Sequence, residues 1–396
     1  MSVIQAIGFW FGYGSGNHIS GSIGRKDTSS AERMAATGVL LAVITGLLIM
    51  LCALPLLEEL SVLLGAGTGE LREATVRYLR ITVFTVPFML VSNVLYNQLR
   101  LAGSAKDSMA GLLVGMVINM VLDPVFILLL KMDVSGAALA SMTGQIAGCL
   151  VLLWSTGRNG NIGIRLSRAD MSFQNIKKIL WGGAPNFCRQ GISSISSVML
   201  NNTAALFGNH AIAALTIAVR ISYVAYALVI GFGQGFQPIC LVNYGAGKYD
   251  RIKKAFFYAL ITVSVFLVIS VGFIYVKSDY LVSKFNSDAD VSDLAVRMIH
   301  AQCRVMPFMG FYILCGMFLQ NIRQFGKATL VTIAENGTFL IPLMLIMPRV
   351  MGLEGLILCR PAASIAALIL SLFIGIRSWK EYLGKETGND RIHGVI

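Results

Sequence analysis

Long apolar stretches recur along this chain of 396 residues, with no long polar interval between them. Each is about 17 to 25 residues long, enough for a helix to cross the ~30 Å hydrocarbon core of a bilayer. Only 13% of the residues are charged, against roughly 25% in soluble domains. We therefore expect an all-α polytopic membrane protein. Its eleven predicted spans are residues 3–19, 34–57, 78–101, 108–131, 134–156, 179–207, 211–242, 255–276, 299–321, 329–348 and 353–376.

The net charge of +12 is explained by where the lysines and arginines lie. Twenty of them occur in alternate loops and in the C-terminal tail, eight occur in the other loops, and four lie within spans. Because cytoplasmic loops carry the excess of Lys and Arg, the tail is predicted to be cytoplasmic. The basic loops thus require no nucleic-acid partner, and we expect none.

Two halves of the chain match each other. "RYLRITVFTVPFM" (77–89) aligns with "RMIHAQCRVMPFM" (297–309) at an offset of 220, and the glycines of "GYGSGNHISGSIG" (12–24) align with those of "GQGFQPICLVNYG" (233–245) at an offset of 221. Corresponding segments lie six spans apart, so both copies cross the membrane in the same direction. Parallel repeats of this kind form the two halves of some secondary transporters, with the substrate path between them.

The repeat also predicts a division of the chain and a gap. We expect an N-terminal lobe (1–156), a cytoplasmic linker (157–178), a C-terminal lobe (179–377) and a cytoplasmic tail (378–396). Residues 177–221 have no counterpart before Met1, so the first lobe is expected to contain spans 2 to 6 only. A truncated transporter without activity is therefore one of the alternatives.

A carboxylate and a proline interrupt the apolar run "INMVLDPVFILLL" (118–130). Ionisable residues inside spans are costly in lipid, so they favour a functional role. Asn119 and Asp123 are four residues apart and share one helix face, while Pro124 removes one N–H donor and leaves a carbonyl available as a ligand. This pattern indicates a cation or proton relay, and an Asp that fixes helix packing is the structural alternative.

Several blocks resemble the multidrug and toxic-compound extrusion (MATE) transporters, especially the MepA-type bacterial branch. They are "GSGNHISGSIGRKD" (14–27), "LDPVFI" (122–127), "GGAPNFCRQG" (182–191), "LNNTAALFGNHAIAALTIAVRI" (200–221) and "GFGQGFQPICLVNYGAGKYDRIKKAF" (231–256). The resemblance implies two six-helix lobes related by the parallel repeat, of which about eleven helices are expected here. It also implies export of cationic or amphipathic compounds in exchange for H⁺ or Na⁺, through rocking-type alternating access.

The same resemblance implies the site residues of the first lobe. The cation site is expected to contain Asp123 and Asn119, together with Asn97 and a hydroxyl from Ser141 or Thr143. The acidic residues of a second family site are replaced in this chain by a segment that begins Arg189-Gln190. We therefore expect the second cation site to be unused.

Polar residues in the second half are candidates for the substrate cavity. Glu335 is the only other acid deep in a span, and a carboxylate there would attract cationic substrates. Arg189 and its neighbour Gln190 follow Pro185, and a structural or gating role is favoured for the arginine. Buried amides need hydrogen-bond partners, so those of the second half either hold the lobe together or face the cavity. These amides belong to Asn201, Asn202 and Gln237.

The main alternative function is a lipid-linked oligosaccharide flippase, which would require several cationic residues in its cavity. The sequence offers Arg189, Arg220, Arg304 and Arg360 within spans. No nucleophile elbow, HExxH or DDxxD pattern is present, so enzyme activity is not expected, and neither is a cofactor or metal. We expect a monomer in a bacterial inner membrane with small-molecule substrates.

Overall fold

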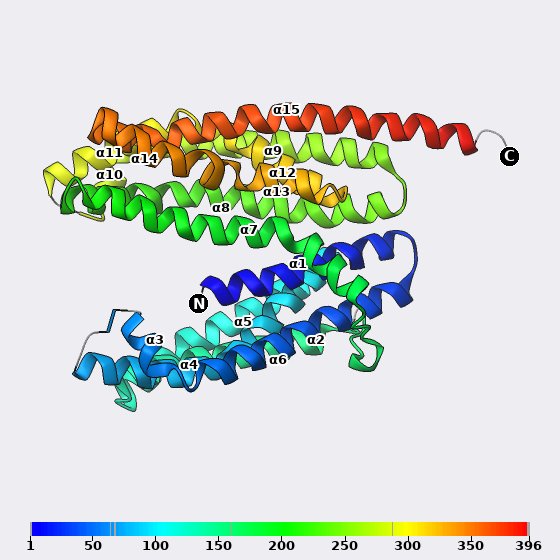
Figure 1. The fold of residues 1–396 in the computed structure, drawn as a ribbon, viewed down its shortest axis with the longest axis horizontal. Coiled ribbons are helices and arrows are strands. Elements are labelled where there is room, and N and C mark those ends of the chain that lie inside the picture. The colour runs from blue at the N-terminus through cyan, green and yellow to red at the C-terminus, as the bar shows by residue number, and fades with distance from the viewer. Residues whose placement is uncertain (1, 64, 67–68, 159, 287, 394–396) are drawn as a thin grey trace. The chain divides into compact units, whose positions relative to one another are not determined.

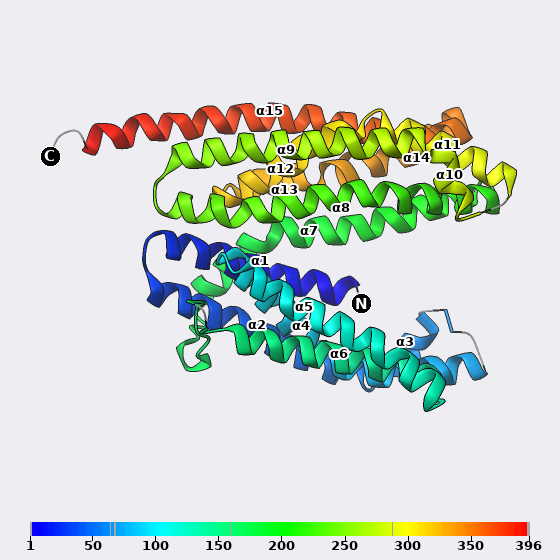
Figure 2. The ribbon, with the colours of Figure 1, turned by 180° about the vertical axis from the view of Figure 1, so that it is seen from behind.

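The computed structural model describes residues 2–63, 65–66, 69–158, 160–286 and 288–393, which form helices and contain no strand. Its contacts divide the chain into two compact units, residues 1–187 and 188–396. Figure 1 and Figure 2 show the helices from opposite sides. The division lies inside one long helix. The expected start of the second lobe at residue 179 therefore remains a prediction.

The first unit is built from six helices, two short helical turns and the beginning of α7. These elements are α1 (Ser2–Gly24), α2 (Thr28–Ala53), α3 (Leu57–Leu63), α4 (Glu70–Leu101), α5 (Ala105–Pro124), the π-helix η1 (Val125–Leu129), α6 (Asp133–Ser155), the 3₁₀ turn η2 (Leu166–Arg168) and α7 (Phe173–Ala205). The helix α4 contacts α1, α2 and α6. Its residues Leu90, Val94 and Leu95 are fully buried, so α4 forms the centre of this unit.

The second unit continues from α7 through eight helices and two short helical segments. These elements are α8 (Asn209–Gly245), α9 (Tyr249–Val276), α10 (Ser278–Ser283), α11 (Ala289–Cys303), the 3₁₀ turn η3 (Met306–Phe308), α12 (Met309–Asn321), α13 (Phe325–Ile333), the π-helix η4 (Ala334–Phe339), α14 (Leu340–Met351) and α15 (Leu353–His393). Its core gathers side chains from α8, α9, α11, α12 and α15.

Helices lie over all eleven predicted spans. Within the described residues, eight helical segments are long and apolar enough to cross a membrane, and a ninth is formed by α11 and α12 together. The remaining two, α1 and α7, contain more polar residues and do not meet that standard. The fold class predicted from the sequence, an all-α polytopic membrane protein, is confirmed.

The duplication is visible in the order and bounds of the helices. The helices α5 and α13 begin at Ala105 and Phe325, and the helices α6 and α15 begin at Asp133 and Leu353, in both cases at an offset of 220. The turns before α5 and α13 also correspond, because Gly103 (φ +100°) and Arg323 (φ +65°) both adopt the left-handed region. The two halves therefore share local geometry that the weak sequence matches only suggested.

The repeated proline acts differently in the two copies. Pro87 lies inside the continuous helix α4, whereas the matching Pro307 lies in η3, where α11 and α12 meet at an angle of 42°. Proline removes a backbone donor and crowds the preceding turn, so either a local adjustment or a bend is possible. The bend places the start of α12 beside the cavity described below.

Glycines allow close helix contact in α1, but the matching glycines in α8 do not. A Cβ atom on Gly12 would lie 3.0 Å from the carbonyl oxygen of Asn93, so α1 and α4 pack backbone to backbone there. A Cβ on Gly231 or Gly235 would meet no atom within 4 Å. The small-residue stripe therefore serves helix packing in α1, and its echo in α8 does not.

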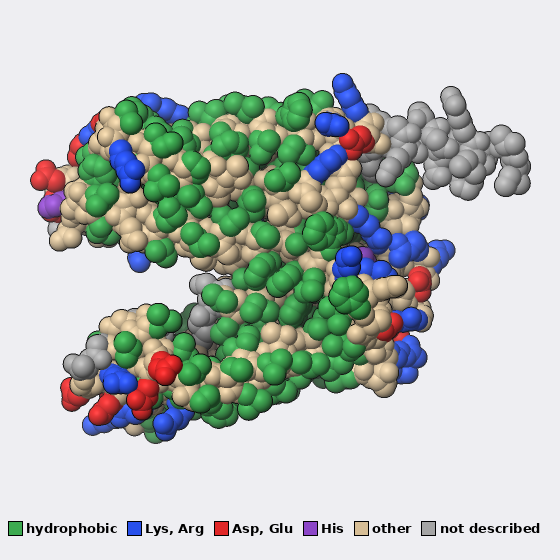
Figure 3. Space-filling view, viewed as in Figure 1, with side chains coloured by type: hydrophobic (Ala, Val, Ile, Leu, Met, Phe, Trp, Pro, Cys, Tyr) green, Lys and Arg blue, Asp and Glu red, His purple; other side chains and the backbone are tan. Residues whose placement is uncertain are grey.

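The surface agrees with a membrane location. In each unit, hydrophobic side chains cover the long sides of the helices, and charged side chains gather at the helix ends (Figure 3). Exposed residues such as Leu51, Met120, Phe273 and Phe373 belong to this apolar surface. In water such a surface would be costly, whereas lipid tails cover it without penalty.

Candidate functional site

In the first unit, α5 and α6 bring together two of the predicted cation-site residues. The amide of Asn119 donates a hydrogen bond to the Ser141 hydroxyl at 3.3 Å. The helices approach closely because a Cβ on Gly144 would lie only 2.6 Å from the Gly115 carbonyl oxygen. Both polar groups line a cavity of about 300 Å³ between α4, α5 and α6. None of the residues that line this cavity carries a charge.

Asp123 lies at the end of α5, directly before Pro124 and the π-helical turn η1. It is partly buried, and no hydrogen bond or ion pair joins it to the rest of the described chain. A π-helical turn inside a span often marks a functional position. The helix around it contains no buried residue in its most apolar window of 18 residues. Asp123 is thus a carboxylate without a bonded partner, on a span that packs against α6 but buries none of its most apolar residues.

The other two predicted residues of this site lie elsewhere in the unit. Asn97 is fully buried and faces α1. Its side chain accepts a hydrogen bond at 3.1 Å from Arg100, which lies on the same helix, α4. Thr143 donates to the Leu139 carbonyl within its own helix. Of the predicted cation-site residues, only Asn119 and Ser141 are joined by a hydrogen bond. The role of the set stays a prediction.

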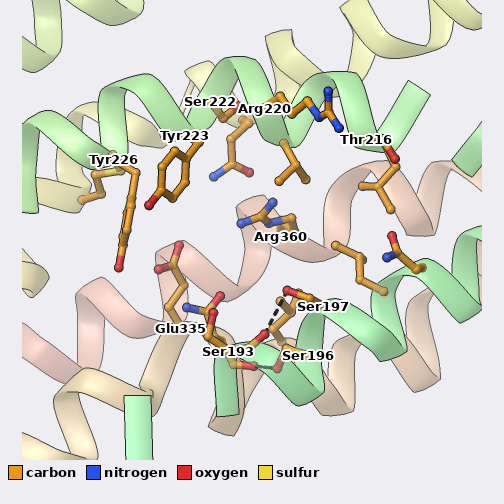
Figure 4. Close-up of a pocket in the computed structure, with 18 of the residues that line it drawn as sticks. Ser193, Ser196, Ser197, Thr216, Arg220, Ser222, Tyr223, Tyr226, Glu335 and Arg360 are labelled. Atoms are coloured by element: carbon orange, nitrogen blue, oxygen red, sulfur yellow. Dashed lines mark hydrogen bonds between the residues drawn. The ribbon is translucent and has the colours of Figure 1, made fainter. Parts of the chain in front are cut away.

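The second unit contains a larger cavity of about 490 Å³. Helical stripes from α7 and α8 form two of its walls, and α11, η3, α12, η4, α14 and α15 contribute the others (Figure 4). The stripes repeat every three or four residues, as one face of a helix does. The lining residues are Arg189, Gln190, Ser193, Ser196, Ser197, Leu200, Asn201, Leu215, Thr216, Val219, Arg220, Ser222, Tyr223, Tyr226, Gln302, Met306, Met309, Glu335, Asn336, Leu340 and Arg360.

Glu335 enters this cavity from the π-helix η4. Its carboxylate accepts a hydrogen bond from the Ser364 hydroxyl at 2.8 Å, and the Tyr312 hydroxyl also interacts with it. Among the described residues, no arginine or lysine forms an ion pair with it. Glu335 is therefore held by neutral hydroxyl groups.

The helix α7 positions η4 through a close contact. A Cβ on Gly337 would lie 2.7 Å from the Ile192 side chain, so only glycine allows α7 and η4 to approach this far. The Ser196 hydroxyl donates a hydrogen bond to the Asn336 carbonyl. A π-helical turn interrupts the regular backbone hydrogen bonds of a helix, so some carbonyl oxygens lack a backbone donor. The Ser196 hydroxyl supplies a donor to one of them.

Three arginines from three helices line the same cavity. The guanidinium of Arg189 on α7 donates to the Tyr226 hydroxyl on α8 at 3.2 Å. The guanidinium groups of Arg220 on α8 and Arg360 on α15 have no hydrogen bond or ion pair within the described part of the chain. Figure 4 shows Arg360 near the middle of the cavity, between the α8 wall and the α7 wall. With Glu335 as the single acid among the lining residues, the formal charge of the wall is positive.

The cavity contains some of the predicted substrate-site residues and others that the sequence did not single out. Glu335, Arg189, Gln190 and Asn201 line it. Asn202 is exposed outside it, and Gln237 is fully buried away from it. Arg220 and Arg360 were visible as charges within spans, but only the fold places them in one cavity.

Curated relatives match almost the whole chain. The multidrug export protein MepA of Staphylococcus haemolyticus (strain JCSC1435) is 27% identical over 374 residues, which cover 94% of this chain and 82% of that protein. MepA of Staphylococcus aureus (strain MSSA476) is 25% identical, and the match covers 93% of this chain and 82% of that protein.

Solved structures share the fold. An outward-facing multidrug resistance MATE family transporter superposes with a TM-score of 0.89 at 24% identity, over 97% of this chain and 86% of that chain. A MOP superfamily transporter from Pyrococcus furiosus, described as having reverse polarity of its binding pocket, superposes with a TM-score of 0.87 at 23% identity, over 95% and 85% of the two chains. The MatE family model matches residues 1–125 and 185–346. This chain belongs to the MatE family.

Proposed function

We propose that this protein is a secondary active efflux transporter that exports amphipathic organic compounds from a bacterial cell. The observation that carries the proposal is the cavity of about 490 Å³ in the second unit, because cavities of roughly 300–1,000 Å³ hold drug-sized ligands. Its wall combines Met306, Met309 and Tyr223 with hydroxyl and amide groups. Methionine adapts to varied apolar shapes, which suits a transporter with many substrates.

The parallel repeat and the named relatives support transport rather than catalysis. The relatives are multidrug export proteins, and the match extends over 94% of this chain for the first of them. Two similar halves can exchange access to a central path by rocking, which is the alternating-access mechanism that we propose. The C-terminal tail is proposed to be cytoplasmic and the protein monomeric.

The proposed coupling site is Asp123 with Asn119 and Ser141 nearby on α5 and α6. A bound H⁺ or Na⁺ would remove the net negative charge of the carboxylate, and this change would alter the relative energies of the two transporter states. A ligand shifts such an equilibrium only by its difference in affinity for the two states. The carboxylate beside the π-helical turn is therefore the proposed point of entry of the coupling ion.

Dye efflux from intact cells tests the proposal. We expect bacteria that lack their own major efflux pumps to accumulate less rhodamine B, an amphipathic zwitterion, when they express this chain. An uncoupler of the proton gradient, or removal of Na⁺, should restore accumulation and identify the coupling ion. Accumulation equal to that of the vector control, with the protein present in the membrane fraction, would refute transport of this kind.

A further inference from the structure

The cavity of the second unit carries the wrong charge for a cationic substrate. Three arginines and one glutamate line it, a formal excess of two positive charges. Arginine stays protonated at any physiological pH, so this excess is permanent even when Glu335 is ionised. An organic cation placed in this cavity would meet repulsion from the guanidinium groups.

The guanidinium groups keep donors that the described protein does not use. Each guanidinium has five N–H donors. Arg189 uses one toward Tyr226, and the guanidinium groups of Arg220 and Arg360 donate to no other described residue. Glu335 does not neutralise them, since its oxygen accepts from Ser364 instead. A charge within a span is costly unless it is paired or solvated, so an anion in the cavity would relieve this cost.

The hydroxyl groups around the arginines suit the same kind of ligand. Ser193 on α7 and Tyr223 on α8 line the cavity around Arg360 (Figure 4), and neither hydroxyl donates to another described residue. The hydroxyls of Ser197 and Thr216 also line it but donate to carbonyls of their own helices. Hydroxyl donors and guanidinium forks together bind carboxylate and phosphate oxygens. The apolar side chains of the same wall leave room for the hydrocarbon part of a ligand.

We infer that this cavity binds the anionic group of an amphipathic molecule, a carboxylate, phosphate or sulfonate, with Arg360 as its main contact. The inference rests on the proposed function, because it names the chemical class that the exporter carries. Among the cationic or amphipathic compounds expected from the family resemblance, it favours amphipathic molecules that are zwitterionic or anionic.

Two rhodamine dyes that differ in one group provide the test. Rhodamine B carries a free carboxylate, and its ethyl ester is the matched cation. Binding of each to the purified full chain in detergent is measured by fluorescence polarisation, which does not depend on transport. We expect rhodamine B to bind about tenfold more tightly than the ester, the factor that one charge-assisted hydrogen-bonded pair provides.

Variants assign the preference to the cavity. Arg360→Gln should reduce the preference to about twofold or less, Arg360→Lys should keep part of it, and Glu335→Gln should increase it. Arg304→Gln is the matched control, because Arg304 lies in the same unit but does not line the cavity. The inference is overturned if the two dyes bind equally, if the ester binds more strongly, or if neither dye binds. It is also overturned if Arg360→Gln keeps the full preference for rhodamine B.

Competition then identifies the source of the anion. Displacement of rhodamine B by dihexanoyl phosphatidylglycerol but not by naphthoate indicates a lipid phosphate, and the reverse indicates a soluble carboxylate. Both results support an anion site. Because binding is measured without a gradient, absence of dye efflux in cells with the preference intact would refute the proposed export but not the anion site.

Discussion

The contact between α5 and α6 predicts a large effect from one added methyl group. In Gly144→Ala, the new Cβ would lie 2.6 Å from the Gly115 carbonyl oxygen and 3.1 Å from the Asn119 Cβ. A backbone atom cannot rotate away, so the helices must separate, and overpacking of this kind costs about 1–3 kcal/mol. Separation also weakens the bond from Asn119 to Ser141 at 3.3 Å, worth about 1 kcal/mol.

Part of this cost is recovered, because alanine favours a helix over glycine by about 1 kcal/mol. The net loss is about 1–3 kcal/mol, which lowers the melting temperature by several degrees, on the order of 5 °C for a unit of this size. Thermal unfolding of the purified protein in detergent, followed by intrinsic fluorescence, measures it.

Gly235→Ala in α8 is the matched control, since its Cβ would meet no atom within 4 Å. It should leave the melting temperature unchanged or slightly higher. The packing argument is refuted if Gly144→Ala has the same melting temperature as the wild type, or if both variants lower the melting temperature equally.

Three further predictions concern the proposed ion site, the cavity and the linker. Asp123→Asn should abolish rhodamine B efflux with normal expression, and retained efflux would exclude the carboxylate from coupling. Tyr226→Phe removes the hydroxyl that holds the Arg189 guanidinium in place at 3.2 Å. Because the arginine then loses its fixed position in the wall, rhodamine B binding should weaken several-fold, with a melting temperature within a few degrees of the wild type; unchanged affinity would contradict this. Backbone and side-chain hydrogen bonds from Ser172 lower the pKa of the Asp170 carboxyl. The first turn of α7 should therefore keep its hydrogen-exchange protection from pH 7 to pH 5. It should lose this protection only as the pH falls through the lowered pKa. Loss of protection already at pH 5, after correction for intrinsic exchange, would contradict the assignment.

The sign of this last effect follows from linkage. A carboxyl group whose pKa is lower in the folded state stabilises that state above its unfolded pKa, and the contribution disappears as the pH falls through the folded pKa. Asp170 is partly exposed to solvent and lies in the segment before α7, so we expect a local change at the start of α7 rather than a change in global stability.

Much of the fold could be predicted because apolar length and repeated motifs depend on the chain alone. The eleven helical stretches and the duplication were visible in the sequence, and the structure contains both. The bend at Pro307 could not be predicted from the sequence, since Pro87 in the matching position leaves α4 continuous. Whether a proline bends a helix depends on the neighbours that fill the gap, which the local sequence does not specify.

The cavity was predicted only in part, for a similar reason. The sequence singled out Arg189, Gln190 and Asn201 as polar residues within one predicted span, and all three line the cavity. Arg360 reaches the same space from α15, and its role depends on how distant helices pack. The pair Asn119 and Ser141 was anticipated from the family resemblance, whereas the position of Asn97 against α1 depends on the fit of Gly12 to α4.

A structure of the protein with bound rhodamine B tests the central claim most directly, because the claim places a substrate group in the cavity between α7, α8 and α15. The account predicts dye density in this cavity with its carboxylate within hydrogen-bonding distance of the Arg360 guanidinium. Density for the dye elsewhere in the protein, with this cavity empty, would contradict it.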